Sequence, residues 1–367
     1  MHAGPSSRLL DLLGIQVPII QAPMAGVSSP AMAAAASNSG GLGSLGVGAM
    51  DASQAQDAVR QFRKLSDGPL NVNLFVHAPA NADERKEAAW LQRLRPEFDR
   101  LGGRAPDTLH EIYRSFLVDD EMLAMLVAEK PRVVSFHFGL PRGPQIEALR
   151  AAGIVLLATA TNLAEARMIE DAGLDAIVAQ GHEAGGHRGM FDPDAEDSRL
   201  GTLALTRILV KSVGLPIIAA GGIMDGAGIA AALALGAGAA QLGTAFVATD
   251  ESLADAGYRE RLAGSAAHQT VMTRVISGRP ARGLANDFTR WGMAVPDDAV
   301  PDYPIAYDAG KALNAAAKSA GQTGYGAQWA GQGAPLVRAL STQALMRALT
   351  DELARARSDA SVGSSLH

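Results

Sequence analysis

Short runs of apolar residues recur along the chain, and most begin about 20 to 30 residues after the previous one, the usual length of a strand-and-helix unit. The runs show no alternation of polar and apolar positions, which is typical of strands buried on both faces. They predict eight strands: Val17–Gln21, Leu42–Leu45, Leu70–Val76, Val133–Phe138, Ile154–Ala158, Ala176–Gln180, Pro216–Ala220 and Ala239–Leu242.

Most of the segments between these runs have apolar residues at the three-to-four spacing of a helix. Clear examples are Asp51–Leu65, Gly143–Ala151, Leu163–Ala172 and Asp225–Leu235. Strands that alternate with helices form parallel βαβ units, and eight such units close into a barrel. The predicted fold is therefore α/β, a (β/α)8 TIM barrel.

Two intervals are longer than the rest, the one after the third strand and the one after the sixth. Both insertions follow a strand, so they lie at the C-terminal face of the barrel, where such folds carry their chemistry. After Asp250 the βα rhythm stops. We expect residues 1–250 to form the barrel, with a helical insertion at 81–130, and residues 251–334 to form a smaller, mostly helical lid domain. Residues 335–367 are expected to form a helix that returns to the barrel and a flexible tail.

Composition excludes several classes of protein. The chain has no cysteine, so disulfides, thiolate metal sites and cysteine nucleophiles are absent. With 32 basic and 38 acidic residues the net charge is −6, and no basic cluster indicates a nucleic-acid partner. No apolar run approaches the roughly 20 residues that cross a bilayer. Residues 1–18 lack the pattern of a cleaved leader, and we expect a cytoplasmic protein with no membrane partner.

Two motifs resemble known sites but lack their context. Gly41, Gly43 and Gly46 match the dinucleotide-binding pattern, yet a helical segment precedes them, whereas that pattern follows a strand. His182 and His187 are one residue too far apart for the helical zinc motif, and two glycines lie between them. We therefore expect neither a Rossmann site nor a metal site.

Glycine-rich turns follow the sixth, seventh and eighth predicted strands. His187 comes directly after Gly185 and Gly186, which allow a flat ligand to approach the backbone. The next two turns contain Gly221, Gly222, Gly243 and Thr244. Turns after strands seven and eight of this barrel commonly bind phosphate through free N–H groups. The pattern predicts a phosphate-bearing ligand beside a histidine.

Six segments together resemble the nitronate monooxygenase family, formerly called 2-nitropropane dioxygenases, over nearly the whole chain. They are Gln21–Gly26, Asn71–Phe75, Ser135–Gly139, Gln180–Gly189, Ala220–Ile223 and Gln241–Thr244. Tyr303, Tyr307 and Lys311, spaced four and four as on one helical face, are similar to the class I members.

The resemblance implies an FMN enzyme that oxidises alkyl nitronates, notably propionate 3-nitronate, with O2 and without NAD(P)H. A nitronate anion would reduce FMN to an anionic semiquinone, and the products would be a carbonyl compound and nitrite. The resemblance implies His187 as the catalytic residue and His137, Tyr303, Tyr307 and Lys311 as substrate ligands. The implied cofactor ligands are Pro23, Met24, Gly26, Asn73, Gln180, Gly185, Gly186, Gly221, Gly222, Gln241, Gly243 and Thr244.

Three other hypotheses stay open at this point. An FMN-dependent enoyl-acyl-carrier-protein reductase has similar glycine turns and a site histidine, but it requires NAD(P)H. A non-catalytic flavin-binding protein is the second alternative, and a barrel without flavin is the third. Trp329 lies in a segment that resembles one near the family's cofactor, but we assign it no role. We expect a monomer or a homodimer.

Overall fold

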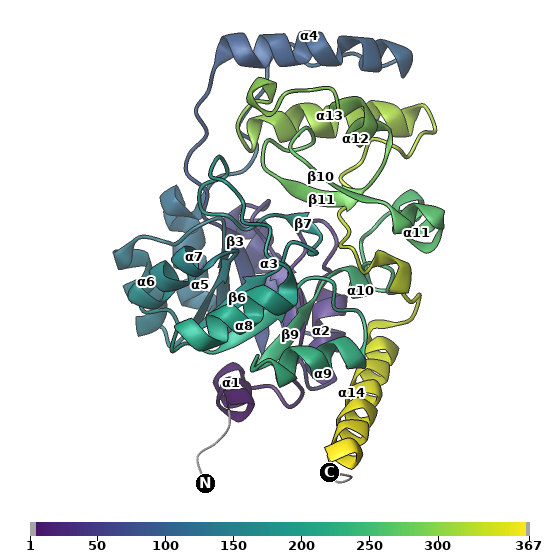
Figure 1. Cartoon of the computed structure of the whole chain (residues 1–367). Helices are drawn as coiled ribbons and strands as arrows, with labels where there is room; N and C mark the ends of the chain where they lie inside the picture. The colour runs from purple at the N-terminus through teal and green to yellow at the C-terminus, as the bar shows by residue number, and fades with distance from the viewer. Residues whose placement is uncertain (1–4, 365–367) are drawn as a thin grey trace.

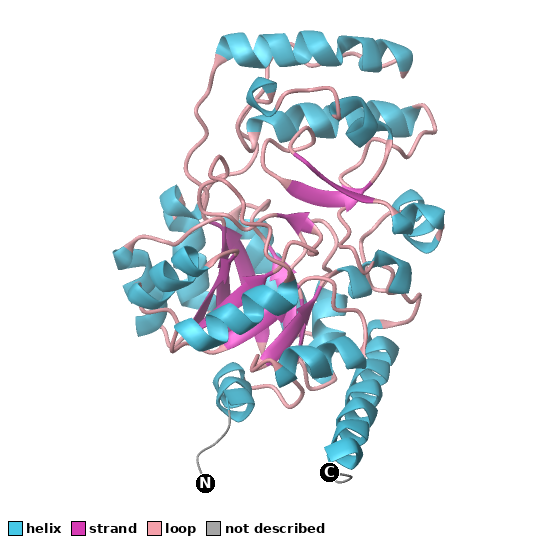
Figure 2. Ribbon diagram, in the orientation of Figure 1, coloured by secondary structure: helices cyan, strands magenta, loops and turns pink. Residues whose placement is uncertain are grey.

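The computed structural model describes residues 5–364 and contains a closed parallel barrel (Figures 1 and 2). Its sheet has the order β1-β9-β8-β6-β5-β4-β3-β2, and a parallel bridge between Ile20 and Leu42 joins the first strand to the last. The strands are β1 (Ile19–Gln21), β2 (Gly43–Gly46), β3 (Leu70–Phe75), β4 (Val133–His137), β5 (Val155–Ala160), β6 (Ala176–Gln180), β8 (Ile217–Ala220) and β9 (Ala239–Leu242). All eight coincide with the predicted runs, and the predicted barrel is confirmed.

Helices cover the outside of the barrel between successive strands. They are α2 (Pro30–Asn38), α3 (Ala52–Arg63), α5 (Asp120–Glu129), α6 (Gly143–Ala151), α7 (Leu163–Asp171), α8 (Thr202–Ser212) and α9 (Gly226–Ala234). At the N-terminal ends of the strands, Leu9 and Leu13 of α1 (Pro5–Leu13) pack with Val133 and Val155. This end of the barrel is therefore closed by apolar side chains, which leaves the opposite end for a site.

Two of the glycines that resemble a dinucleotide motif allow close packing on β2, Gly43 against α2 and Gly46 against the segment that follows β1. A Cβ atom on Gly43 would lie 1.9 Å from the carbonyl oxygen of Ala33, and one on Gly46 would lie 2.7 Å from the nitrogen of Ala25. The order of elements is helix and then strand, the reverse of a Rossmann turn. Glycine at these positions allows α2 and the segment after β1 to approach β2 closely, and the order of elements is the one that the sequence context predicts.

A second layer lies over the C-terminal ends of the barrel strands (Figure 1). It holds α11 (Ala256–Ala263), α12 (Asp287–Gly292), α13 (Ile305–Ser319) and an antiparallel sheet of β10 (Thr270–Thr273), β11 (Ala281–Leu284) and β7 (Gly186–His187). The long helix α4 (Glu84–Arg100) also belongs here, because Trp90 and Phe98 pack with Phe288 and Leu313. The 81–130 segment thus supplies α4 to the upper layer and α5 to the barrel.

The chain ends on the barrel again. Leu345 and Leu349 of α14 (Thr342–Ser364) pack with Met32 and Ile229, on α2 and α9. The tail expected at the C-terminus falls partly on residues 365–367, which lie outside the described residues, as do residues 1–4. Over the part of the chain that the structure describes, we find no helix with the length and apolarity needed to cross a bilayer.

Candidate active site

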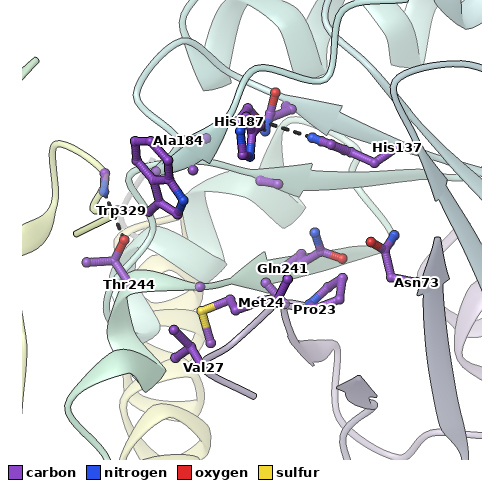
Figure 3. Close-up of a pocket in the computed structure, with 18 of the residues that line it drawn as sticks. Pro23, Met24, Val27, Asn73, His137, Ala184, His187, Gln241, Thr244 and Trp329 are labelled. Carbon is purple, nitrogen blue, oxygen red and sulfur yellow. Dashed lines mark hydrogen bonds between the residues drawn. The ribbon is translucent and has the colours of Figure 1, made fainter. Parts of the chain in front are cut away.

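A cavity of about 330 Å³ opens at the C-terminal ends of the barrel strands, under the second layer. Every residue that the sequence analysis assigned to a site lines this cavity, except Tyr303. His187 and His137 lie across the open space from Pro23, Gln241 and Asn73 (Figure 3). Residues from all parts of the barrel therefore converge on one volume, which is in the range of small-ligand sites.

One end of the cavity is lined by main-chain N–H groups that have no partner among the described residues. Within residues 5–364, the main-chain N–H groups of Gly221, Gly222, Gly243 and Thr244 donate to no protein acceptor. Gly221 and Gly222 have φ angles of 119° and 70°, which side-chain-bearing residues rarely adopt. The Thr244 hydroxyl oxygen accepts a 2.9 Å hydrogen bond from the N–H of Gly331 and keeps its own proton for another acceptor. Such unpaired donors fit a phosphate group.

The middle of the cavity carries amide groups and a tight turn. The side chain of Gln241 makes no hydrogen bond with the described residues, and Asn73 uses only its Nδ2, which donates to Ser135. Pro23, Met24 and Gly26 form the turn after β1, which Ser28 fixes by accepting a hydrogen bond from the Met24 N–H. Unused amide oxygens and nitrogens in this position fit the heteroatoms of a flat ring system.

His187 lies on the two-residue strand β7, where it pairs with Ala281 of β11. Its Nε2 is 2.9 Å from Ser277 Oγ, and its ring is 5.2 Å from the ring of Trp329 and 5.4 Å from that of Tyr303. Burial, with nearby His137 and Arg279, lowers the pKa of His187 to about 3. The imidazole is therefore neutral at physiological pH.

His137 and Gln180 hold the backbone of His187. The His187 carbonyl oxygen accepts a 3.1 Å hydrogen bond from His137 Nε2 and a 2.9 Å bond from Gln180 Nε2. The other ring nitrogen of His137 is 3.1 Å from Thr159 Oγ1, and Gln180 Oε1 accepts from the N–H of Gly189. Both nitrogens of His137 thus have protein partners, and the two residues position the loop that carries His187.

The prediction that Tyr303, Tyr307 and Lys311 share one helical face is wrong for Tyr303. Helix α13 begins at Ile305, after Pro304, and the residue before a proline is disfavoured in the helical conformation. The Tyr303 ring still contacts the site from behind, because it packs against His187, Phe138 and Phe75. It supports the wall of the cavity and does not line it.

Tyr307 and Lys311 lie on α13 and line the cavity. Lys311 is exposed, and its ammonium nitrogen is 4.7 Å from the ring centre of Tyr113 and 5.7 Å from that of Tyr307. No carboxylate in the described part of the chain lies within ion-pair distance of it. Partial burial lowers the pKa of Lys311, an effect that Asp308 opposes. The cavity therefore has an unpaired cation and aromatic rings at one side.

Several lining residues escape sequence reasoning. Tyr113 comes from the long segment after β3, where no motif marks it, and Tyr258 comes from α11. Trp329, which we could not assign, places its ring on His187 while its carbonyl oxygen accepts from the Tyr258 hydroxyl. These three aromatic residues are far apart in the sequence, so no local pattern could have marked them as parts of one site.

Three histidines with lowered pKa values predict a stability that falls in acid. Burial lowers the pKa of His77 and of His137 to about 4, and that of His187 to about 3. On unfolding, each regains a pKa of about 6.5. The unfolded chain therefore binds more protons between about pH 6.5 and 4, and stability declines as the pH falls through this range.

Each histidine contributes at most about 1.4 kcal/mol per pH unit to this decline. Urea unfolding at pH 7, 6 and 5 measures it, with His77→Phe as the matched variant. Neither ring nitrogen of His77 makes a side-chain hydrogen bond with the described residues, and its nearest carboxylate oxygen, on Glu111, is 4.0 Å from Nε2. We expect a steeper loss in the natural chain than in the variant. Equal slopes would contradict the assignment to His77.

A closed barrel with a cavity at the C-terminal ends of the strands is the arrangement of (β/α)8 enzymes. This chain has that arrangement, and its cavity has main-chain N–H groups that are unpaired within the described chain and a half-buried histidine on its walls.

Comparison with known proteins identifies the family. The family model of nitronate monooxygenase matches residues 6–352. The chain is 61% identical to a nitronate monooxygenase of Paraburkholderia phytofirmans over 94% of each chain, and 53% identical to one of Pseudomonas aeruginosa over 95% of this chain and 99% of the relative. The chain therefore belongs to the nitronate monooxygenase family and is an oxidoreductase, which confirms the predicted family.

Solved structures of two other proteins have the same fold as this chain. Nitroalkane oxidase from Streptomyces ansochromogenes is 40% identical, with a TM-score of 0.87 over 96% of this chain and 99% of its own. FabK from Thermotoga maritima is 30% identical, with a TM-score of 0.73 over 96% and 97%. Both share the fold across nearly the whole chain.

Proposed function

We propose that the protein is an FMN-dependent monooxygenase that oxidises alkyl nitronates, with propionate 3-nitronate as a substrate and O2 as the co-substrate. The observation that carries this proposal is one cavity with unpaired N–H donors at one end and a neutral histidine and an unpaired ammonium group elsewhere on its walls. The donors suit the FMN phosphate, and the ammonium group suits an anionic substrate.

The chain would hold FMN through three groups of residues. The N–H groups of Gly221, Gly222, Gly243 and Thr244 would bind the phosphate. The side chains of Asn73 and Gln241, and the turn at Pro23 and Met24, would contact the ring system. When bound, FMN supplies a redox centre that accepts electrons one at a time, and reaction with O2 yields a carbonyl compound and nitrite.

His187 favours a nitronate over the neutral nitroalkane. A general base is most effective when its pKa is near the working pH, and that of His187 is lowered to about 3. It is therefore a weak acceptor for a carbon-bound proton, but a neutral imidazole can donate a hydrogen bond to a nitronate oxygen. A nitronate has already lost its proton, so it needs only this second role.

The aromatic side chains keep water from the reacting atoms. Phe75, Tyr307 and Trp329 surround the imidazole at ring-centre distances between 5.2 and 6.4 Å. In such an apolar surrounding, hydrogen bonds and charges act more strongly on an anion than they do in water. Tyr113 and Tyr307 also hold the Lys311 ammonium group at the cavity.

Replacing Lys311 by methionine is expected to raise the KM for propionate 3-nitronate roughly tenfold, because a hydrogen bond to a charged group is lost. Lys318→Met is the matched control: it removes a lysine from the same helix that is paired with Asp255 and does not line the cavity. Steady-state oxygen uptake measures both variants. Equal KM values in Lys311→Met and the natural protein would exclude Lys311 from substrate binding.

Two measurements on the purified protein test the proposed function. The bound cofactor is released and identified by mass, and FMN is expected. Oxygen uptake is then followed with propionate 3-nitronate and, separately, with NADH, and anaerobic mixing shows which of them reduces the flavin. We expect reduction and oxygen uptake with the nitronate alone. Reduction by NADH without a reaction of the nitronate would favour the reductase alternative.

A further inference from the structure

The connector between β10 and β11, residues 274–280, forms a buried wall behind His187. Ser277 is fully buried there, and the turn at Gly278 packs so closely on residues 301–303 that a Cβ atom would lie 2.6 Å from the Pro301 carbonyl oxygen. The N–H of Arg188 donates to the carbonyl oxygen of Pro280, which ties the connector to the His187 loop. Ser277 therefore has a fixed place beside the imidazole.

The Ser277 hydroxyl has one proton and two possible acceptors. His187 Nε2 is 2.9 Å from Oγ, whereas the Arg279 carbonyl oxygen is 3.3 Å away. Bonds between a hydroxyl and an oxygen usually span about 2.5–3.0 Å, so the carbonyl is a poor acceptor at this distance. The hydroxyl proton is then directed to Nε2. Because that nitrogen accepts the hydrogen bond, it must be unprotonated.

If Nε2 is unprotonated, the single proton of the neutral ring is on Nδ1. Nδ1 makes no hydrogen bond with the described residues and is not among the buried atoms that lack a partner, so it is the nitrogen that opens to the cavity. The neighbouring His137 has the opposite arrangement. Its Nε2 faces a carbonyl oxygen, which only accepts, so His137 carries its proton on Nε2.

The surroundings disfavour a second proton on His187. The guanidinium of Arg279 is buried and lies 4.3 Å from the ring centre of Phe138, which itself packs against His187. Arg279 donates to the carbonyl oxygen of Met190 and has no carboxylate within ion-pair distance in the described part of the chain. Because this uncompensated cation lies in the same wall, the imidazole stays neutral, and its one proton must be placed by a partner.

We propose that Ser277 is a positioning residue that donates to His187 Nε2 and thereby presents Nδ1–H to an oxygen of the anionic substrate. The identity of that substrate rests on the proposed function, but the position of the proton in the resting enzyme does not. The two can therefore be tested separately.

The direct test is nitrogen NMR of the cofactor-loaded enzyme labelled with ¹⁵N-histidine, in which protonated and bare ring nitrogens of a neutral imidazole give separate signals. We expect His187 to be protonated on Nδ1 and His137 on Nε2, with each assigned from a variant that lacks it. In Ser277→Ala the His187 proton should move toward Nε2, and Ser277→Thr should restore Nδ1. A His187 protonated on Nε2 in the natural enzyme would overturn the proposal, whatever the substrate.

Kinetics give a second readout. Ser277→Ala should lower kcat/KM for the nitronate about tenfold to a hundredfold, as expected for a lost hydrogen bond to a charged oxygen, while Ser277→Thr stays close to the natural enzyme. Ser37→Ala is the control, since it removes another buried serine hydroxyl that bonds only backbone groups. Unchanged kcat/KM in Ser277→Ala would also overturn the role. An enzyme with the expected tautomers but no nitronate oxidation would contradict only the proposed function.

Discussion

Replacing His187 by asparagine is expected to lower kcat/KM for the preformed nitronate about tenfold to a hundredfold, because the shorter amide does not reach the oxygen that the imidazole N–H contacts, and a hydrogen bond to a charged group is lost. With a neutral nitroalkane we expect a smaller change. The imidazole has a pKa lowered to about 3, so it is already a poor acceptor for the carbon-bound proton in the natural enzyme. The comparison of the two substrates therefore tests whether the side chain acts as a hydrogen-bond donor or as a base.

The measurement is steady-state oxygen uptake with both substrates, together with the amount of flavin bound per chain. His268→Asn makes the same substitution at an exposed histidine that does not line the cavity. We expect full flavin content in both variants and a loss of activity only in His187→Asn. Unchanged rates in His187→Asn would remove His187 from the reaction.

The second large effect is expected at the end of the cavity where we propose that the FMN phosphate binds. Gly221 has a φ of 119°, and a Cβ atom there would lie 2.7 Å from Thr202 Oγ1 and 3.1 Å from the nitrogen of Ala184. Gly221→Ala would strain the turn by about 1–3 kcal/mol and displace its N–H groups. We expect the affinity for FMN to fall at least about tenfold.

Gly243→Ala tests the same end without strain in the protein. A Cβ atom there would make ordinary contacts, 3.5 Å from Ala22 Cβ and 3.7 Å from Met24 Sδ, and it would enter the cavity. A weaker affinity in this variant would therefore report on the ligand. Gly143→Ala is the control, because a Cβ atom there meets no atom within 4 Å. Titration of the cofactor-free protein with FMN measures all three, and equal affinities would contradict the phosphate site.

The barrel could be predicted because its strands are buried on both faces, so that each strand is a continuous apolar run in the sequence. Val133–His137 and Ala176–Gln180 are examples in which the structure and the pattern agree within one residue. The turns at Gly221 and Gly243 were predictable for a related reason: their position at the ends of the seventh and eighth strands is itself a signal. At these places the residue types and their positions along the chain predict the same structure.

The upper layer was less predictable because its contacts are long-range. The pairing of His187 with Ala281 joins segments that are far apart in sequence, and neither has a strand-length apolar pattern. Tyr303 was placed on a helix because its spacing fits, although Pro304 prevents the helix from including it. Ser277 carries no motif, and its role depends entirely on the connector that brings it to His187.

A crystal structure of the protein with the cofactor that co-purifies with it tests the central claim most directly. We predict density for FMN in the cavity, with its phosphate within hydrogen-bond distance of the N–H groups of Gly221, Gly222, Gly243 and Thr244 and with Nδ1 of His187 directed to the space over the ring. A phosphate bound elsewhere, or an imidazole turned away from the flavin, would contradict the account.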